Sequence, residues 1–109
     1  MKKTDALQGS LDLLVMKVLS RHSSVHGYAI MSRIEEISGE VLRVEEGSIY
    51  PALHRMEEAG LVKATWITKD NGRRARVYEL TALGRTQLES EEARWKAVTG
   101  AVQRVLKLA

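Results

Sequence analysis

The stretch that decides the fold is residues 47–80, GSIYPALHRMEEAGLVKATWITKDNGRRARVYEL. Its first part predicts a helix that ends before Gly60, because its apolar residues share one helical face: Ile49, Leu53 and Met56. We expect Ser48 to cap this helix, which places Pro51 in the first turn, where proline is tolerated. Pro51 also disfavours helical backbone at Tyr50, so a start nearer Pro51 is the alternative.

A β-hairpin is predicted directly after this helix. Residues 61–68 and 74–80 are rich in Val, Ile, Thr, Trp and Tyr, as strands are. Between them, Asn-Gly at 71–72 is typical of a two-residue type I′ loop. That loop would place two pairs of residues opposite each other: Trp66 with Val77, and Lys69 with Arg74. Basic side chains would then crowd the tip of the hairpin.

Two helices are predicted before this stretch. Residues 6–21 carry one apolar stripe at helical spacing: Leu7, Leu11, Leu14, Val15 and Val18. Leu13 and Met16 fall on the opposite side, so this helix is apolar on two faces. Residues 28–38 repeat the spacing with three isoleucines: Ile30, Ile34 and Ile37. Gly39 is placed to end the second helix in a left-handed conformation.

A long helix is predicted after the hairpin, capped by Thr81 and ending near Lys107. Its apolar residues recur at heptad-like positions: Leu88, Trp95, Val98, Val102 and Val105. Such a stripe must be covered, which predicts a dimer interface. The second apolar face of the first helix, with Leu13 and Met16, is its candidate partner.

Composition limits the class of protein. The chain has 109 residues, with 17 Lys and Arg against 14 Asp and Glu, and 44% of its residues are hydrophobic. These values are typical of one globular unit, which we divide into a first part at 1–80 and a dimerisation helix at 81–109. The chain has no cysteine, no apolar run long enough to span a membrane and no signal-peptide pattern. We therefore expect a cytoplasmic protein.

Catalytic and metal-binding patterns are missing from the sequence. The acidic pairs at 35–36 and 57–58 are adjacent, so their side chains diverge around a helix instead of flanking one substrate. His22, His26 and His54 have no HExxH or CxxC companion, and no phosphate-binding glycine loop is present. We expect a protein that is not an enzyme and that uses no metal or cofactor.

The order helix, helix, helix, basic hairpin, long helix predicts a winged helix-turn-helix, a mainly α fold with a small β-hairpin. Two helices brace a third, whose exposed end can enter a DNA major groove while the hairpin reaches the neighbouring backbone. Residues 1–80 are therefore predicted to be a winged-helix DNA-binding domain. Tyr50 could donate to a phosphate, with core packing as its alternative. His54 and Arg55 could reach base edges, although His54 could equally be an uninvolved surface residue.

A winged helix that binds proteins instead of DNA is the competing interpretation. Residues 31–60 carry a net charge of −4, and their carboxylates would repel phosphate wherever they faced it. Residues 61–80, in contrast, carry +3. Saturable, sequence-dependent retardation of DNA would favour a regulator, and its absence at low salt would favour the adaptor.

Four blocks of the sequence resemble the PadR family of transcriptional regulators: LQGSLDLL at 7–14, HGYAI at 26–30, GSIYPALHRMEEAGLV at 47–62 and GRRARVYELTALG at 72–84. The resemblance extends over residues 7–106, and the single short C-terminal helix resembles the smaller branch of the family. It implies a dimeric repressor that binds an inverted-repeat operator. With the basic hairpin tip included, the expected DNA-binding residues are Ser48, Tyr50, Pro51, His54, Arg55, Lys69, Arg73, Arg74 and Arg76.

Members of that branch that bind flat aromatic compounds use a tryptophan on the last helix, and Trp95 stands at a similar place. The resemblance therefore implies an aromatic effector that would lie against Trp95, with Leu13 and Met16 as further candidate contacts. Plain packing of Trp95 in the dimer interface is the alternative.

Overall fold

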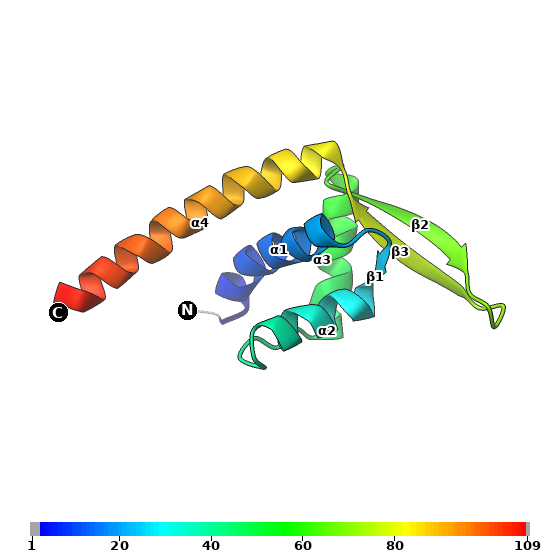
Figure 1. Cartoon of the computed structure of the whole chain (residues 1–109), viewed down its shortest axis with the longest axis horizontal. Helices are drawn as coiled ribbons and strands as arrows, with labels where there is room; N and C mark the ends of the chain where they lie inside the picture. The colour runs from blue at the N-terminus through cyan, green and yellow to red at the C-terminus, as the bar shows by residue number, and fades with distance from the viewer. Residues whose placement is uncertain (1–2, 109) are drawn as a thin grey trace.

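The computed structural model describes the backbone of residues 3–108 and the side chains of residues 10–108. The elements of this part follow one another as α1 (Lys3–Arg21), β1 (Val25–His26), α2 (Gly27–Ile37), α3 (Glu46–Glu58), β2 (Val62–Thr68), β3 (Arg74–Leu80) and α4 (Ala82–Leu108) (Figure 1). The predicted class, mainly helical with a small hairpin, is confirmed. The sequence did not predict β1.

Helices α1, α2 and α3 pack against one another around an apolar core, and α1 also contacts α4. The buried side chains come largely from the periodic positions of the sequence: Leu11, Val15 and Leu19 of α1, Ile30 and Ile34 of α2, Ile49, Leu53 and Met56 of α3, and Val62, Tyr78, Leu80 and Leu88 of later elements. Because α3 buries one face among these residues, its opposite face is left toward solvent.

Some expectations for the first two helices are corrected. Met16 is only 2% exposed and belongs to the core, so it does not lie on a free second face, and Leu13 is half-buried against the same core. Ile37 is 72% exposed, because it is the last residue of α2 and no later element covers it. Gly39 has φ +64, as predicted. The side chain of Leu7 lies outside the described residues.

The strands form one antiparallel sheet in the order β1-β3-β2. The two residues of β1 pair only with Val77 and Tyr78 of β3. Beyond these pairs, β2 and β3 continue as a two-stranded ribbon that projects from the helices (Figure 1). We call β2, β3 and the connecting residues 69–73 the wing.

The predicted register of the wing is wrong by one residue. Trp66 pairs with Arg76 and not with Val77, and Arg74 pairs with Thr68. The cause is the loop. Lys69 N–H donates to the carbonyl of residue 73 at 2.8 Å, and residues 70–72 form a three-residue loop whose glycine has φ +82. A shift of one residue exchanges the cross-strand neighbours of every wing side chain.

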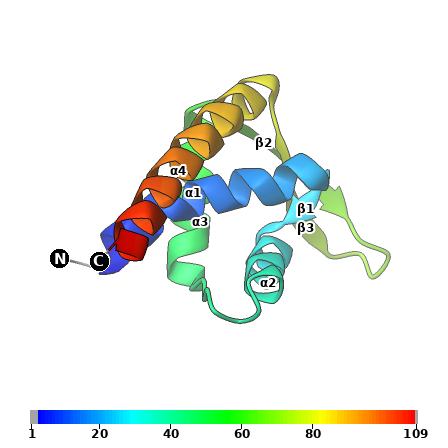
Figure 2. The same cartoon turned by 60° about the vertical axis from the view of Figure 1, so that its left-hand side comes forward.

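Helix α4 begins at a cap and runs 27 residues along α1 and past it (Figure 2). Thr81 Oγ1 accepts a hydrogen bond from Gly84 N–H at 3.0 Å and donates to Gly60 O at 2.6 Å, so the predicted cap is confirmed. At this end α4 comes close to the chain before β2, because a Cβ on Gly84 would lie 2.2 Å from the carbonyl oxygen of Leu61. The C-terminal half of α4 is exposed.

Candidate nucleic-acid interface

Helix α3 is the element that the sequence assigned to the major groove, and it begins earlier than predicted. Glu45 is the N-cap, and its carbonyl accepts hydrogen bonds from the backbone N–H groups of Ser48 and Ile49. Ser48 is therefore not the cap but a half-buried residue of the first turn. Pro51 lies inside the helix and has no N–H to give, so the carbonyl of Gly47 lacks its usual helical donor.

The solvent face of α3 presents Tyr50, Pro51 and His54, all exposed. Tyr50 is 43% exposed, and its ring lies against the first residue of α2: a Cβ on Gly27 would come within 2.6 Å of Tyr50 Cε1. His54 Nε2 lies 3.7 Å from a carboxylate oxygen of Glu58, one turn further along α3. The face thus offers a phenol, an imidazole and an apolar ring, but no free cation.

Arg55 is turned away from this face toward α1. Its guanidinium donates to Asp12 Oδ1 at 3.1 Å. Burial raises the pKa of Asp12, although the positive charge of Arg55 and its hydrogen bond act in the opposite direction. The sequence did not predict this pair, because the two residues are 43 positions apart. The contact ties the candidate recognition helix to the first helix.

Arginines gather around one tryptophan on the inner face of the wing. The guanidinium carbon of Arg74 lies 4.8 Å from the Trp66 ring centroid, and that of Arg76 lies 5.8 Å from it. Both oxygens of Glu57 on α3 accept hydrogen bonds from Arg76 Nη2, at 2.9 and 2.8 Å. Trp66 and Glu57 were not among the predicted site residues, since only the observed register and packing bring them to Arg76.

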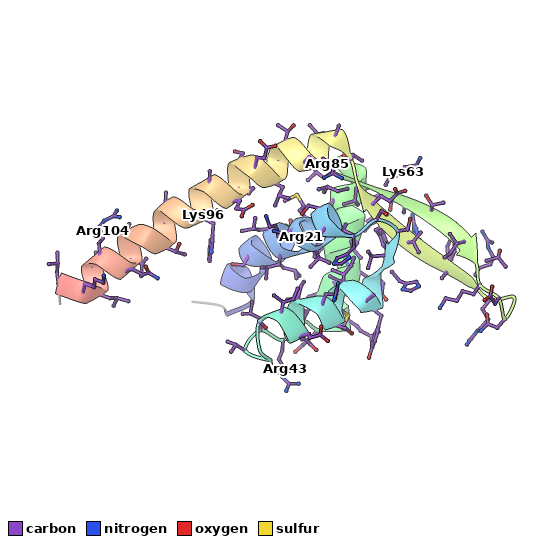
Figure 3. All side chains as sticks on the ribbon, viewed as in Figure 1. Arg21, Arg43, Lys63, Arg85, Lys96 and Arg104 are labelled. Carbon is purple, nitrogen blue, oxygen red and sulfur yellow. The ribbon has the colours of Figure 1, made fainter. Side chains whose placement is uncertain are left out.

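The tip of the wing carries the other predicted cations. Lys69 and Arg73 face each other across the three-residue loop and are exposed. Arg73 N–H is held by Asn71 Oδ1 at 3.0 Å. Among the described residues, neither Lys69, Arg73 nor Arg74 forms an ion pair with a carboxylate. Other labelled cations, such as Arg85 and Arg104 on α4, lie away from the wing tip (Figure 3).

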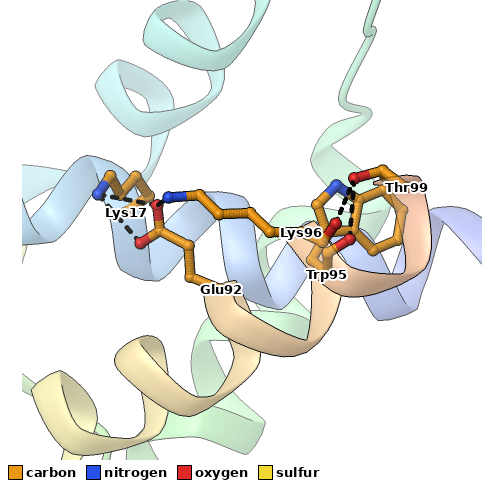
Figure 4. Close-up of polar contacts among 5 residues, drawn as sticks. All are labelled: Lys17, Glu92, Trp95, Lys96 and Thr99. Carbon is orange, nitrogen blue, oxygen red and sulfur yellow. Dashed lines mark hydrogen bonds and ion pairs between the residues drawn. The ribbon is translucent and has the colours of Figure 1, made fainter. Parts of the chain in front are cut away.

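Most of the predicted stripe on α4 is exposed in the single chain: Trp95, Val98, Val102 and Val105. Leu88 differs, since it is buried in the core of the same chain. Glu92 accepts hydrogen bonds from Lys17 on α1, at 3.1 and 3.3 Å, just before the exposed part begins (Figure 4). The bond from Lys17 holds the pKa of Glu92 below its usual value.

The expected contacts of Trp95 with the first helix do not form one pocket in the single chain. Leu13 and Met16 line a pocket of about 190 Å³ together with Leu61 and residues of α4 that precede Trp95. Trp95 is 47% exposed. Its own backbone carbonyl accepts a hydrogen bond from Thr99 Oγ1 (Figure 4). The exposed part of the Trp95 ring faces solvent in the single chain.

Among the side chains of residues 10–108, no group of three or more His, Cys, Asp or Glu is placed to hold a metal ion. Within residues 3–108, no helix has both the length and the apolar composition that crossing a membrane requires.

Comparisons with known proteins agree on one family. A sequence model described as "Transcriptional regulator PadR-like family" matches residues 15–90. A transcriptional regulator of Mycobacterium tuberculosis is 38% identical over 69 residues, which cover 63% of this chain and 61% of that protein. An uncharacterised 37.1 kDa protein of Streptomyces fradiae is 40% identical over 78 residues, covering 72% of this chain and 21% of that protein. The chain thus spans about three fifths of the first relative and one fifth of the second.

Solved structures have the same fold. A PadR-like transcriptional regulator from Bacillus cereus aligns with a TM-score of 0.79 and 29% identity, over 94% of this chain and 96% of that one. Bacillus subtilis PadR, solved in complex with operator DNA, aligns with a TM-score of 0.67 and 23% identity, over 74% of this chain and 46% of that one. At 23% identity the second likeness establishes the fold.

Proposed function

Because the chain belongs to the PadR-like family of transcriptional regulators, we propose that it is a homodimeric repressor of the cytoplasm that binds an inverted-repeat DNA operator. Proteins of this family are regulators of transcription and not enzymes. The observation that carries the proposal is the placement of three cations without a carboxylate partner, Lys69, Arg73 and Arg74, on a wing beside the exposed face of α3.

In this proposal the two surfaces have different tasks. The solvent face of α3, with Ser48, Tyr50, Pro51 and His54, enters the major groove, where base edges carry the sequence information. The wing places Lys69, Arg73 and Arg74 on backbone phosphates, which supply affinity that does not depend on sequence. Arg55 and Arg76 are bonded to Asp12 and Glu57 instead, so we do not propose them as direct contacts.

Part of the acidic charge of residues 31–60 is engaged within the domain. Glu57 is paired with Arg76, and Glu35 Oε2 accepts a hydrogen bond from the backbone N–H of Val44 in the loop before α3. These contacts hold two of the carboxylates in the body of the domain. Glu46 and Glu58 of α3 stay exposed, so the wing cations must supply most of the attraction to phosphate.

We propose that the two-fold assembly forms through α4, with residues 1–80 as the DNA-binding part and residues 81–109 as the dimerisation helix. Trp95, Val98, Val102 and Val105 make a continuous apolar stripe that a second copy can cover. A two-fold dimer of this kind would present its recognition helices about 34–36 Å apart, one turn of DNA. Repression then follows from occupying the promoter.

Trp95 is also the residue that we propose for effector binding. Its ring is half-exposed on the α4 stripe, and a planar indole stacks well on flat aromatic compounds. A ligand held between two such rings in the dimer would change the angle between the two α4 helices and hence the spacing of the recognition helices. Leu13, beside the base of α4, is a further candidate contact.

The test measures binding to a DNA fragment from upstream of the protein's own gene. Fluorescence anisotropy gives the Kd at several salt concentrations. We expect saturable, sequence-dependent binding by the wild type. Arg74→Ala should weaken binding to all sequences and lower the slope of log Kd against log salt by about 0.9 for the lost phosphate contact. Arg85→Ala, on α4, is the matched control and should leave the slope unchanged. No binding at low salt would refute the proposal and favour a protein-binding adaptor.

A further inference from the structure

Arg76 is held by more contacts than any other cation of the wing. Its guanidinium makes two hydrogen bonds to Glu57 of α3, at 2.9 and 2.8 Å. Its central carbon also lies 5.8 Å from the ring of Trp66 and 6.0 Å from the ring of Tyr78. A side chain that is fixed in this way on both the wing and α3 is a link between the two elements.

The link lies where the wing has little other support. Strand β1 pairs with β3 only at Val77 and Tyr78, so the wing beyond them is a two-stranded ribbon. An isolated two-stranded ribbon is marginally stable in water. Within the described part of the chain, the bond between Arg76 and Glu57 is the single ion pair between the wing and a helix.

The strand register connects Arg76 to Arg74, which lies nearer the tip of the wing. Trp66 and Arg76 are cross-strand neighbours, and Arg74 lies diagonally across from Trp66 on the same face. The indole is 55% exposed and has the Arg74 guanidinium 4.8 Å from its centroid. Contact between an arginine and an indole is favourable, and it restricts the conformations of the arginine. The series Glu57, Arg76, Trp66, Arg74 thus runs from α3 to a cation without a carboxylate partner.

We propose that Arg76 is a positioning residue and not a phosphate ligand. It sets the angle of the wing to α3 through Glu57, and through Trp66 it holds Arg74 toward the DNA backbone. This role rests on the proposed binding of operator DNA and deepens it. It assigns a function to Glu57, a carboxylate that on charge alone should oppose DNA binding.

The decisive variant is Glu57→Ala, because the two interpretations of Arg76 predict opposite signs. If Arg76 is a phosphate ligand that Glu57 partly neutralises, loss of the carboxylate frees it and operator binding becomes tighter. If Arg76 is a positioning residue, the same variant weakens binding, and we expect about three- to tenfold. Glu89→Ala removes an exposed carboxylate of α4 that forms no ion pair in the described part of the chain, so it controls for the change of charge and should not weaken binding.

A double-mutant cycle gives the second measurement. We expect Arg76→Gln to weaken binding about as much as Glu57→Ala, and the double variant to be no weaker than either single one, because both remove the same link. Arg76→Lys keeps the charge but loses the planar guanidinium that lies near the rings of Trp66 and Tyr78, so it should behave like Arg76→Gln. The salt slope should change far less for Arg76→Gln than for Arg74→Ala.

The outcomes separate the two levels of the proposal. Tighter binding by Glu57→Ala, additive effects in the cycle, or full activity of Arg76→Lys with a reduced slope for Arg76→Gln would overturn the positioning role while DNA binding stands. A wild type that binds no DNA would overturn the proposed function and this role with it. Circular dichroism and amide exchange at α1 and α2 check that each variant is folded.

Discussion

Gly84→Ala should be strongly destabilising, because α4 has no room for a side chain at this position. The added Cβ would lie 2.2 Å from the carbonyl oxygen of Leu61 and 2.6 Å from Leu80 Cδ1. The oxygen cannot move away freely, since it accepts a hydrogen bond from Thr81 N–H at 3.1 Å and has Thr81 Oγ1 at 3.0 Å. Relief of the overlap must therefore shift α4 and disturb its cap.

The expected cost combines these two effects. Overpacking costs about 1–3 kcal/mol, and loss of a cap costs about 1 kcal/mol, so we expect the free energy of unfolding to fall by about 2–4 kcal/mol. That is a large part of the roughly 5–15 kcal/mol available to a small domain. It corresponds to a fall in Tm of about 10–20 °C.

Urea and thermal unfolding, followed by circular dichroism at one fixed protein concentration, measure this effect. Gly100→Ala is the matched control on the same helix. There a Cβ would make an ordinary contact, 3.6 Å from a guanidinium nitrogen of Arg104. Because alanine favours a helix interior over glycine, Gly100→Ala should stabilise by about 0.5–1 kcal/mol. A Gly84→Ala protein as stable as the wild type would refute the close approach of α4 to Leu61.

Three further predictions concern the α4 stripe, Asp12 of α1, and the contact between Gly27 of α2 and Tyr50 of α3. Trp95→Ala should weaken dimerisation by roughly a hundredfold or more in sedimentation equilibrium, since truncating a buried tryptophan costs about 3 kcal/mol or more; an unchanged dimer would remove Trp95 from the interface. Because the pKa of Asp12 is raised, its favourable contribution to folding is complete at acid pH and is lost as the pH rises through the folded-state pKa. Asp12→Asn, which stays neutral and can still accept from Arg55, should therefore gain stability relative to the wild type between pH 4 and pH 7 in urea unfolding, and a constant difference would contradict the raised pKa. Gly27→Ala should displace the ring of Tyr50 and weaken operator binding, but it should have no such effect in a Tyr50→Ala background, and equal effects in both would exclude the ring as the cause.

The helices could be predicted from the sequence because the apolar spacing that defines each helix lies within that helix. The spacing of Ile49, Leu53 and Met56 defines a buried face whatever the partner is, and all three are in the core. The hairpin was also predicted, but its register was not. Asn71-Gly72 is compatible with loops of two or three residues, and the choice between them decides which residue faces Trp66.

The candidate site was predicted in part. Its cations form a run that can be read directly from the sequence, whereas their carboxylate partners lie far away in the sequence. A basic run is visible in the sequence, but nothing local shows that Arg76 meets Glu57, 19 positions away, or that Arg55 meets Asp12. These pairs depend on how α3 packs between α1 and the wing. The sequence predicts Arg55 and Arg76 as DNA contacts, and in the fold both are bonded to carboxylates of other elements.

These two ion pairs also bear on which element supplies affinity for DNA and which supplies sequence specificity. Arg55 joins one flank of α3 to α1 by an ion pair, and Arg76 joins the other flank to the wing. The face between them presents Tyr50, Pro51 and His54, with no cation free of a carboxylate. Contacts from α3 to the bases must then come mainly from hydrogen bonds and apolar surface, while the wing tip supplies most of the charge. The salt dependence of binding should accordingly respond to substitutions in the wing and hardly at all to substitutions of Tyr50 or Pro51.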